Sequence, residues 1–280
     1  MNKNTPADNH TQPDSRRRNL ILGGLSLLTV SACAQNHVTK ALSCPIIPEE
    51  TAGPYPADGS NPMAQGRPDG PPPGGNPPPG EMPMQLNAGG ETPNFLARSD
   101  KIRSDLTRSS TGVIAGGIPV RINLQLVNTG GCTPLTGYAV YIWHCTADGR
   151  YSMYSDGLLK EDFLRGVQSA DQAGNVQFTS IFPGCYAGRW PHIHFEIYPS
   201  IEQATDSANK LKTSQLALPE AACRQVYAHS AYGSSLANLG HISLDSDNVF
   251  GDGYQLQMAE VSGDEKQGYN IDLKIGLSTI

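Results

Sequence analysis

Two histidines one residue apart offer the clearest chemistry in the sequence. His192 and His194 begin an alternating run that ends at Tyr198 and is typical of a β-strand. Side chains at positions i and i+2 of a strand project from the same face, about 7 Å apart, so two imidazoles placed this way can bind one metal ion. The same spacing also fits two histidines that only pack on a surface or in a core.

A tyrosine and an arginine precede this pair in a short segment. Pro183 and Gly184 form a turn signal, Tyr186 follows two residues later, and Arg189 lies three residues before His192. These neighbours favour a metal-dependent site over a pair of structural histidines.

Short β-strands must position these residues. Alternating apolar and polar residues predict strands at 120–127, 138–144, 175–181, 192–198 and 269–275. The only plausible helix-containing connection is 211–227. This spacing predicts an all-β fold: a β-sandwich core of antiparallel strands with long loops and a Pro/Gly-rich N-terminal arm.

The composition narrows the function classes. The chain has 280 residues, a formal net charge of −6 and only 16% charged residues, with no basic stripe, so a nucleic-acid partner is not expected. It contains 30 Gly and 22 Pro, which excludes a helical bundle. Eleven Pro and seven Gly fall within 53–83, so this stretch is interpreted as a tether.

Three regions are therefore expected along the chain. Residues 1–33 form an export signal. Residues 34–112 form an N-terminal arm with a Pro/Gly-rich insertion at 57–93. Residues 113–280 form the β domain.

The first region has the features of an export signal. Arg16 and Arg17 precede an apolar run, Leu20–Val30, that is too short to remain as a membrane-spanning helix. The paired arginines predict the twin-arginine route, although Asn19 occupies a position where that motif usually has an aromatic residue. Export by the general secretory route is the alternative.

The end of this signal has two interpretations. Val30–Cys33 resembles a lipobox, which would leave a lipidated Cys33 as a membrane anchor. Ala32–Ala34 also fits an ordinary peptidase site, which would release a soluble protein. Either way the mature protein is expected outside the cytoplasm, in the periplasm or cell envelope.

The cysteines agree with an oxidising compartment. There are six, none of them in a C-x-x-C pair, which excludes a zinc ribbon or a thioredoxin motif. The five that follow Cys33 predict two disulfides and one unpaired thiol. Cys132 and Cys145 are each expected to have a partner.

Several blocks of the chain, in order, resemble the intradiol ring-cleavage dioxygenase family, in its exported, single-chain, protocatechuate 3,4-dioxygenase-like branch. The resemblance runs from Cys44 to the C-terminus apart from the Pro/Gly insertion. The blocks that carry it are Glu50–Tyr55, Pro134–His144, Asp148–Ser152, Phe163–Gly166, Ile181–Tyr186 and Gly251–Tyr254.

The resemblance implies a metal and its ligands. Carried over residue by residue, the family's iron ligands fall on Tyr151, Tyr186, His192 and His194, and its active-site arginine falls on Arg189. Fe(III) is a hard cation that favours anionic oxygen, which suits two phenolates beside two neutral imidazoles. Tyr186 is expected to take up a substrate proton. His144, His229 and His241 are expected not to be ligands.

The function expected from this resemblance is that of a non-haem Fe(III) dioxygenase. It would cleave a catecholic ring between the two hydroxyl-bearing carbons with O2, giving a muconate-type diacid. One alternative is a catalytically inactive envelope lipoprotein that binds aromatic or envelope ligands. A second is a copper- or zinc-binding module built on His192 and His194. The sequence indicates no oligomeric state.

Overall fold

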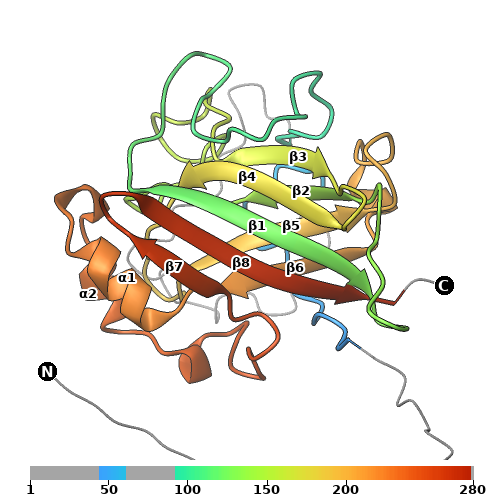
Figure 1. Ribbon diagram of the computed structural model, residues 1–280. Coiled ribbons are helices and arrows are strands. Elements are labelled where there is room, and N and C mark those ends of the chain that lie inside the picture. The colour runs from blue at the N-terminus through green and yellow to red at the C-terminus, as the bar shows by residue number, and fades with distance from the viewer. Residues whose placement is uncertain (1–43, 61–91, 279–280) are drawn as a thin grey trace, which may run out of the picture. The chain divides into compact units, whose positions relative to one another are not determined.

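A computed structural model describes residues 44–60 and 92–278, which form a β-sandwich of two four-stranded sheets (Figure 1). The first sheet has the strand order β4-β1-β8-β7 and the second has the order β3-β2-β5-β6. The strands are β1 (Pro119–Asn128), β2 (Ala139–Trp143), β3 (Arg165–Ser169), β4 (Asn175–Ile181), β5 (His192–Tyr198), β6 (Lys212–Ala217), β7 (Glu260–Asp264) and β8 (Gly268–Leu277).

The predicted all-β sandwich is confirmed, with one departure in strand pairing. In the second sheet, every described pair is antiparallel. In the first, β1 pairs antiparallel with β4 but parallel with β8, where Ile122 is opposite Ile271. A parallel pair requires a long connection between its strands. Here that connection contains strands β2 to β7, which come between β1 and β8 in the sequence.

Most alternating runs became strands close to their predicted bounds. The runs at 175–181 and 192–198 coincide with β4 and β5. The predicted helix-containing connection at 211–227 holds both β6 and the helix α1 (Glu220–Tyr227), followed by α2 (Ser235–Leu239). The short strands β3, β6 and β7 were not predicted. The 3₁₀ turns are Ser207–Asn209, Ser230–Tyr232 and Leu244–Ser246.

The sandwich has a core between its sheets and a second apolar layer outside one of them. Alternate side chains, among them Ile122, Phe178 and Phe195, fill the space between the sheets. A separate cluster that includes Phe95 and Trp143 covers the outer face of the second sheet. Every residue of β5 is therefore buried, on both faces of the strand.

Parts of the predicted arm supply this second layer and pack on the sandwich. Ile47 N donates a hydrogen bond to Gly276 O at 2.9 Å, and Leu106 N donates one to Thr179 O at 2.8 Å. Phe95 is fully buried. Residues 61–91, which are most of the predicted insertion, lie outside the described residues.

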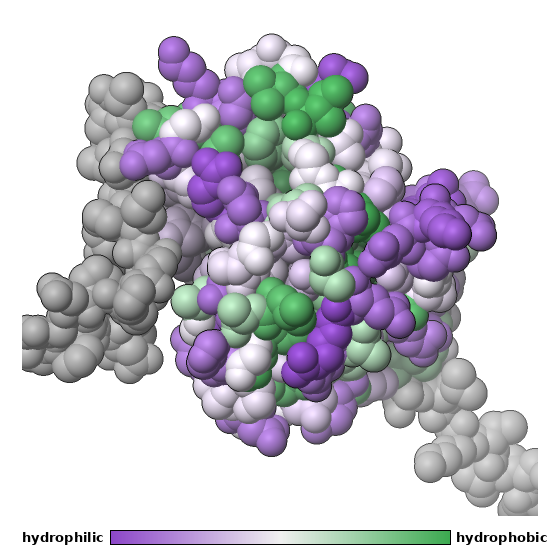
Figure 2. Space-filling model, turned by 90° about the vertical axis from the view of Figure 1, so that its left-hand side faces the viewer, coloured by the Kyte–Doolittle hydropathy of each residue, from purple (hydrophilic) through white to green (hydrophobic). Residues whose placement is uncertain are grey.

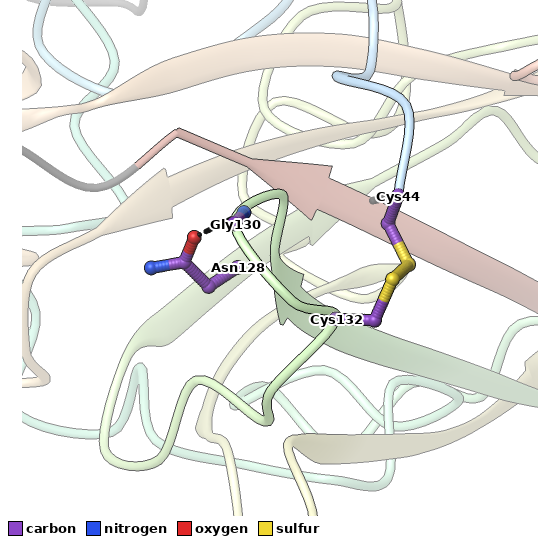
Figure 3. Close-up of a disulfide and its surroundings, with 4 residues drawn as sticks. All are labelled: Cys44, Asn128, Gly130 and Cys132. Carbon is purple, nitrogen blue, oxygen red and sulfur yellow. Dashed lines mark hydrogen bonds between the residues drawn. A yellow bond between two sulfur atoms is a disulfide. The ribbon is translucent and has the colours of Figure 1, made fainter. Parts of the chain in front are cut away.

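A disulfide joins the arm to the loop after β1. Cys44 is bonded to Cys132, and beside this bond Gly130 N donates a hydrogen bond to the Asn128 side chain (Figure 3). Cys132 therefore has the partner expected of it. The prediction for Cys145 is wrong, because its thiol is free and buried. Cys185 and Cys223 are also free and buried, so the described residues hold one disulfide rather than two.

On the face beside α1 and α2, apolar groups form small separate areas among polar ones (Figure 2). No helix within 44–60 and 92–278 combines the length and hydropathy needed to cross a membrane.

Candidate metal centre

The outer face of the second sheet carries the two histidines. Along β5, Ile193 and Phe195 point into the core between the sheets, so His192 and His194 point to the opposite face. Both imidazoles are only 2% exposed, because the second apolar layer covers this face.

Two loops bring the tyrosines to the same place. Tyr151 lies in the turns that follow β2, and Tyr186 lies in the loop between β4 and β5. Tyr186 Oη is 3.2 Å from His192 Nε2, which is 3.0 Å from His194 Nε2. The ring centroid of Tyr151 is 5.9 Å from that of Tyr186 and 6.4 Å from that of His194. The structure thus brings all four predicted ligands together.

The spacing of these atoms fits a shared metal ion. Two ligand atoms that are about 2.1 Å from one metal, and at right angles to each other, lie about 3.0 Å apart. The His192–His194 and Tyr186–His192 separations match this value. The Tyr151 hydroxyl is buried beside Tyr186 without a well-formed hydrogen bond. The residues present therefore fit the Fe(III) centre that the resemblance implies.

Burial acts in opposite ways on the two kinds of ligand. It lowers the pKa of His192 to about 3 and the pKa of His194 well below its usual value, so both imidazoles are neutral and have a lone pair for a metal. It raises the pKa of Tyr151 and of Tyr186 far above the usual value. Phenolates therefore form at this site only beside a cation.

Neighbouring groups fix the orientation of both imidazoles. His192 Nδ1 donates a hydrogen bond to Trp190 O at 2.5 Å, which leaves the Nε2 lone pair free to bind a metal. The ring of Trp143 stacks on that of His194, with centroids 4.8 Å apart and planes only 4° from parallel. The rings are thus held in place before any metal binds.

Arg189 is fixed beside the centre by two partners. Its Nε donates to Asp247 Oδ2 at 2.9 Å, and its NH2 group donates to Gln215 Oε1 at 2.7 Å. Asp247 also accepts hydrogen bonds from three backbone N–H groups, so its carboxylate is rigid. The positive charge of Arg189 acts on both Tyr186 and Tyr151, lowering the pKa of each against the larger effect of burial.

The sequence analysis missed the role of a second arginine, Arg165. Its guanidinium is 1% exposed and donates to Tyr55 O, Pro56 O, Ser152 O, Ser152 Oγ and Tyr141 Oη, at 3.0 to 3.1 Å. It therefore ties the N-terminal arm to the turn that carries Tyr151. The only sign of this role in the sequence was the position of Arg165 in the Phe163–Gly166 block of the family resemblance.

Three other histidines lie apart from the four predicted ligands. His144 is buried, and its two ring nitrogens are hydrogen-bonded to Cys145 O and Ser180 Oγ. His229 and His241 are exposed. In the described part of the chain no group of three His, Cys, Asp or Glu side chains is placed to bind a metal. A centre here thus depends on the tyrosines, and a copper or zinc module would have only two histidines.

A groove of about 840 Å³ lies elsewhere, on the outer face of the first sheet. It contains none of the predicted ligands, and its polar lining includes Asn123, Gln125, Asn175, Gln177 and Asp272.

Comparison with known proteins relates the chain to dioxygenases. Residues 90–205, which include the four predicted ligands and Arg189, match the dioxygenase family model. Over 70 residues the chain is 37% identical to the chlorocatechol 1,2-dioxygenase of Rhodococcus opacus. That stretch covers 25% of this chain and only 27% of the length of that relative.

Solved structures share the fold. An intradiol ring-cleavage dioxygenase from Tetranychus urticae superposes with a TM-score of 0.57 at 22% identity, over 84% of this chain and 95% of its own. A second dioxygenase superposes with a TM-score of 0.53 at 25% identity, over 65% of this chain and 88% of its own. Taken together, the family model over 90–205 and the relative over 70 residues show that the chain is similar to dioxygenases, and the solved structures show that it shares the fold of intradiol ring-cleavage dioxygenases.

Proposed function

We propose that the protein is a non-haem Fe(III) dioxygenase that cleaves a catecholic ring between its two hydroxyl-bearing carbons, giving a muconate-type diacid. The observation that carries this proposal is that His192 Nε2 lies 3.2 Å from Tyr186 Oη and 3.0 Å from His194 Nε2, near the buried hydroxyl of Tyr151. The named activity of the chlorocatechol dioxygenase relative supports it.

Tyr151, Tyr186, His192 and His194 would hold the iron. When bound, Fe(III) would supply the positive charge that keeps the phenols and the substrate diol deprotonated and would make the ring reactive towards O2. The surroundings of these side chains supply rigidity, because buried ligands with fixed neighbours lose little freedom when the metal binds.

Tyr186 and Tyr151 differ in a way that suggests separate roles. Tyr186 is half-buried, whereas Tyr151 is 2% exposed. A substrate that enters from solvent therefore reaches Tyr186 first. Tyr186 is suited to accept a proton from the substrate hydroxyl at its Oη, while Tyr151 stays in place.

Arg189 is suited to stabilise negative charge on the bound ring. Its guanidinium is held by Asp247 and Gln215, so it needs no rearrangement when charge develops. Half-buried like Tyr186, it lies on the side from which substrate would enter.

Oxygen consumption tests this function. The purified protein is loaded with iron, and O2 uptake is followed with catechol and substituted catechols while a muconate-type product is identified by mass. The proposal predicts uptake of one O2 per ring cleaved. Iron-loaded protein that consumes no O2 with any catechol would contradict it.

We also infer that the protein works outside the cytoplasm, reached by the twin-arginine route and held by a lipid on Cys33. Residues 1–43 lie outside the described residues, and the Cys44–Cys132 disulfide supports the inference because such bonds persist in oxidising compartments. Cell fractionation tests it. Arg16→Lys with Arg17→Lys should leave the protein in the cytoplasm, and Cys33→Ser should release it from membranes. Equal distribution of all forms would contradict the inference.

A further inference from the structure

The N-terminal segment from Glu50 to Tyr55 forms one wall of the candidate centre. Gly53 has a φ of +67°, and a Cβ built on it would lie 3.4 Å from His194 Cε1. The ring of Tyr55 stacks on that of Tyr151, with centroids 4.7 Å apart. Gly53 therefore lies against one predicted ligand, His194, and Tyr55 against another, Tyr151.

Glu50, at the other end of the wall, is held near Arg189. Its backbone N donates to Thr213 O at 2.9 Å, and its Oε1 accepts from Gln257 Nε2 at 3.2 Å. Gln257 Nε2 also donates to Gln215 O at 3.1 Å, and Gln215 Oε1 accepts from Arg189 at 2.7 Å. Gln257 thus links the half-buried Glu50 carboxylate to the backbone of Gln215, the residue whose side chain holds Arg189, and the charge of Arg189 acts on Glu50 by lowering its pKa.

The charges at this end of the site are mainly negative. The guanidinium of Arg189 is paired with Asp247 at 2.9 Å. Glu50 and the exposed Asp252 are close enough to act on each other, and Asp247 adds to the same field. Lys212, on the neighbouring strand, is paired with Glu49 at 3.0 Å. Around Glu50 there are therefore two further carboxylates, Asp252 and Asp247, and one guanidinium, which is already paired with Asp247.

We propose that Glu50 is a specificity-determining residue that disfavours catechols bearing a carboxylate and favours uncharged or amine-bearing catechols. This inference rests on the proposed function, because it assigns the substrate class of the same site. Its basis is simple: Arg189 already has a carboxylate partner, so an incoming substrate carboxylate meets Glu50 instead of a free cation. Repulsion between the substrate carboxylate and Glu50 should lower kcat/KM roughly tenfold.

Oxygen uptake by the iron-loaded protein tests the proposal with three matched substrates. These are 4-methylcatechol, 3,4-dihydroxybenzoate and dopamine, whose ring substituents are uncharged, anionic and cationic. At pH 8, kcat/KM for 3,4-dihydroxybenzoate should be about tenfold or more below the other two values. Glu50→Gln keeps the acceptor oxygen for Gln257 and removes only the charge. It should raise the ratio of 3,4-dihydroxybenzoate to 4-methylcatechol about tenfold.

A neighbouring acid provides the control. Glu49 is exposed and faces Lys212 rather than the site, so Glu49→Gln should leave this ratio unchanged.

The pH dependence gives a second readout. Burial raises the pKa of Glu50 to about 7, with Gln257 and Arg189 lowering it and Asp252 and Asp247 raising it. As the pH rises from 6 to 8, Glu50 loses its proton, so the ratio of 3,4-dihydroxybenzoate to 4-methylcatechol should fall in the wild type. The ratio should stay flat in Glu50→Gln.

The outcomes separate the two proposals. Turnover of any of the three catechols supports the proposed function. Turnover in which 3,4-dihydroxybenzoate is preferred, or in which Glu50→Gln leaves the ratio unchanged, overturns the role of Glu50 alone. No turnover of any catechol overturns both.

Discussion

The two sheets of the sandwich share one sequence pattern but differ in what covers them. In the first sheet, β4 alternates between exposed and buried residues, and polar side chains such as Gln177, Asn123 and Asp272 are hydrogen-bonded to one another across its outer face. In the second sheet, β5 is buried throughout. Polar residues are solvated on one outer face and enclosed on the other, so only the second can hold a dry metal centre.

Because the outer face of the second sheet is buried, each polar side chain on it affects the stability of the fold. A buried polar or charged group is costly unless it has a partner. His192 has Trp190 O, Arg165 has five acceptors, and Glu196 has Tyr198 and Lys210. Equivalent substitutions on the two outer faces should therefore have unequal effects.

Removing a ligand should give the largest difference. His194→Ala is expected to abolish iron binding and to lower kcat/KM by about 1,000-fold or more, equivalent to about 4 kcal/mol. Asn123→Ala, on the outer face of the first sheet, should leave iron content and turnover unchanged. Iron analysis and O2 uptake measure both. Full activity in His194→Ala would contradict the assignment.

Removing Arg165 should give the next largest effect, on stability. Arg165→Met leaves the carbonyls of Tyr55 and Ser152 without their donor and removes one of the two donors to Pro56 O, which should cost about 3 to 4 kcal/mol of unfolding free energy. Arg121→Met, at an exposed position of β1, should change it by less than about 0.5 kcal/mol. Urea unfolding measures both. Similar values for the two variants would mean that the arm is not held by Arg165.

The disulfide between the arm and the first sheet's loop should contribute somewhat less. Its two cysteines are 88 residues apart, and its loss should cost about 3 kcal/mol, which is typical of a native disulfide. Cys44→Ser should therefore lower the urea midpoint. Reduced wild type should unfold at the same urea concentration as this variant, and oxidised wild type at a higher one. An equal midpoint in all three would show that the bond adds no stability.

The smallest effect concerns pH. Burial, with a further contribution from Asp58, raises the pKa of Glu196 from 4.5 to about 7. Between these values the folded state holds a proton that the unfolded state releases, so this group stabilises the protein at low pH and loses that contribution as the pH rises through 7. From pH 5 to 8 the wild type should lose about 1 to 2 kcal/mol more than Glu196→Gln. Identical pH profiles would contradict the assignment.

The sequence predicted the strands and the four ligands better than it predicted the residues that pack around those ligands. Alternation found β4 and β5 to the residue, and the resemblance brought Tyr151, Tyr186 and the two histidines together. The sequence could not predict that β5 is buried on both faces. That depends on distant contacts, such as Tyr55 against Tyr151, which leave no periodic signal.

Hydrogen bonds and disulfides between residues far apart in the sequence could not be predicted either. Arg165 binds the carbonyls of Tyr55 and Pro56, about 110 residues away, and backbone acceptors leave no trace in residue type. The number of cysteines suggested a second disulfide, because a count does not reveal which thiols are buried and unpaired in the fold. Cys145 is one of these.

The visible absorption spectrum of iron-loaded protein tests the central claim most directly. If Tyr151 and Tyr186 bind Fe(III) as phenolates, the protein should take up one iron per chain and become red-brown through phenolate-to-iron charge transfer. Tyr186→Phe should shift or weaken this band while the fold is retained, and addition of catechol should shift it further in the wild type. Colourless protein that takes up no iron, or a band unchanged in both Tyr186→Phe and Tyr151→Phe, would contradict the account.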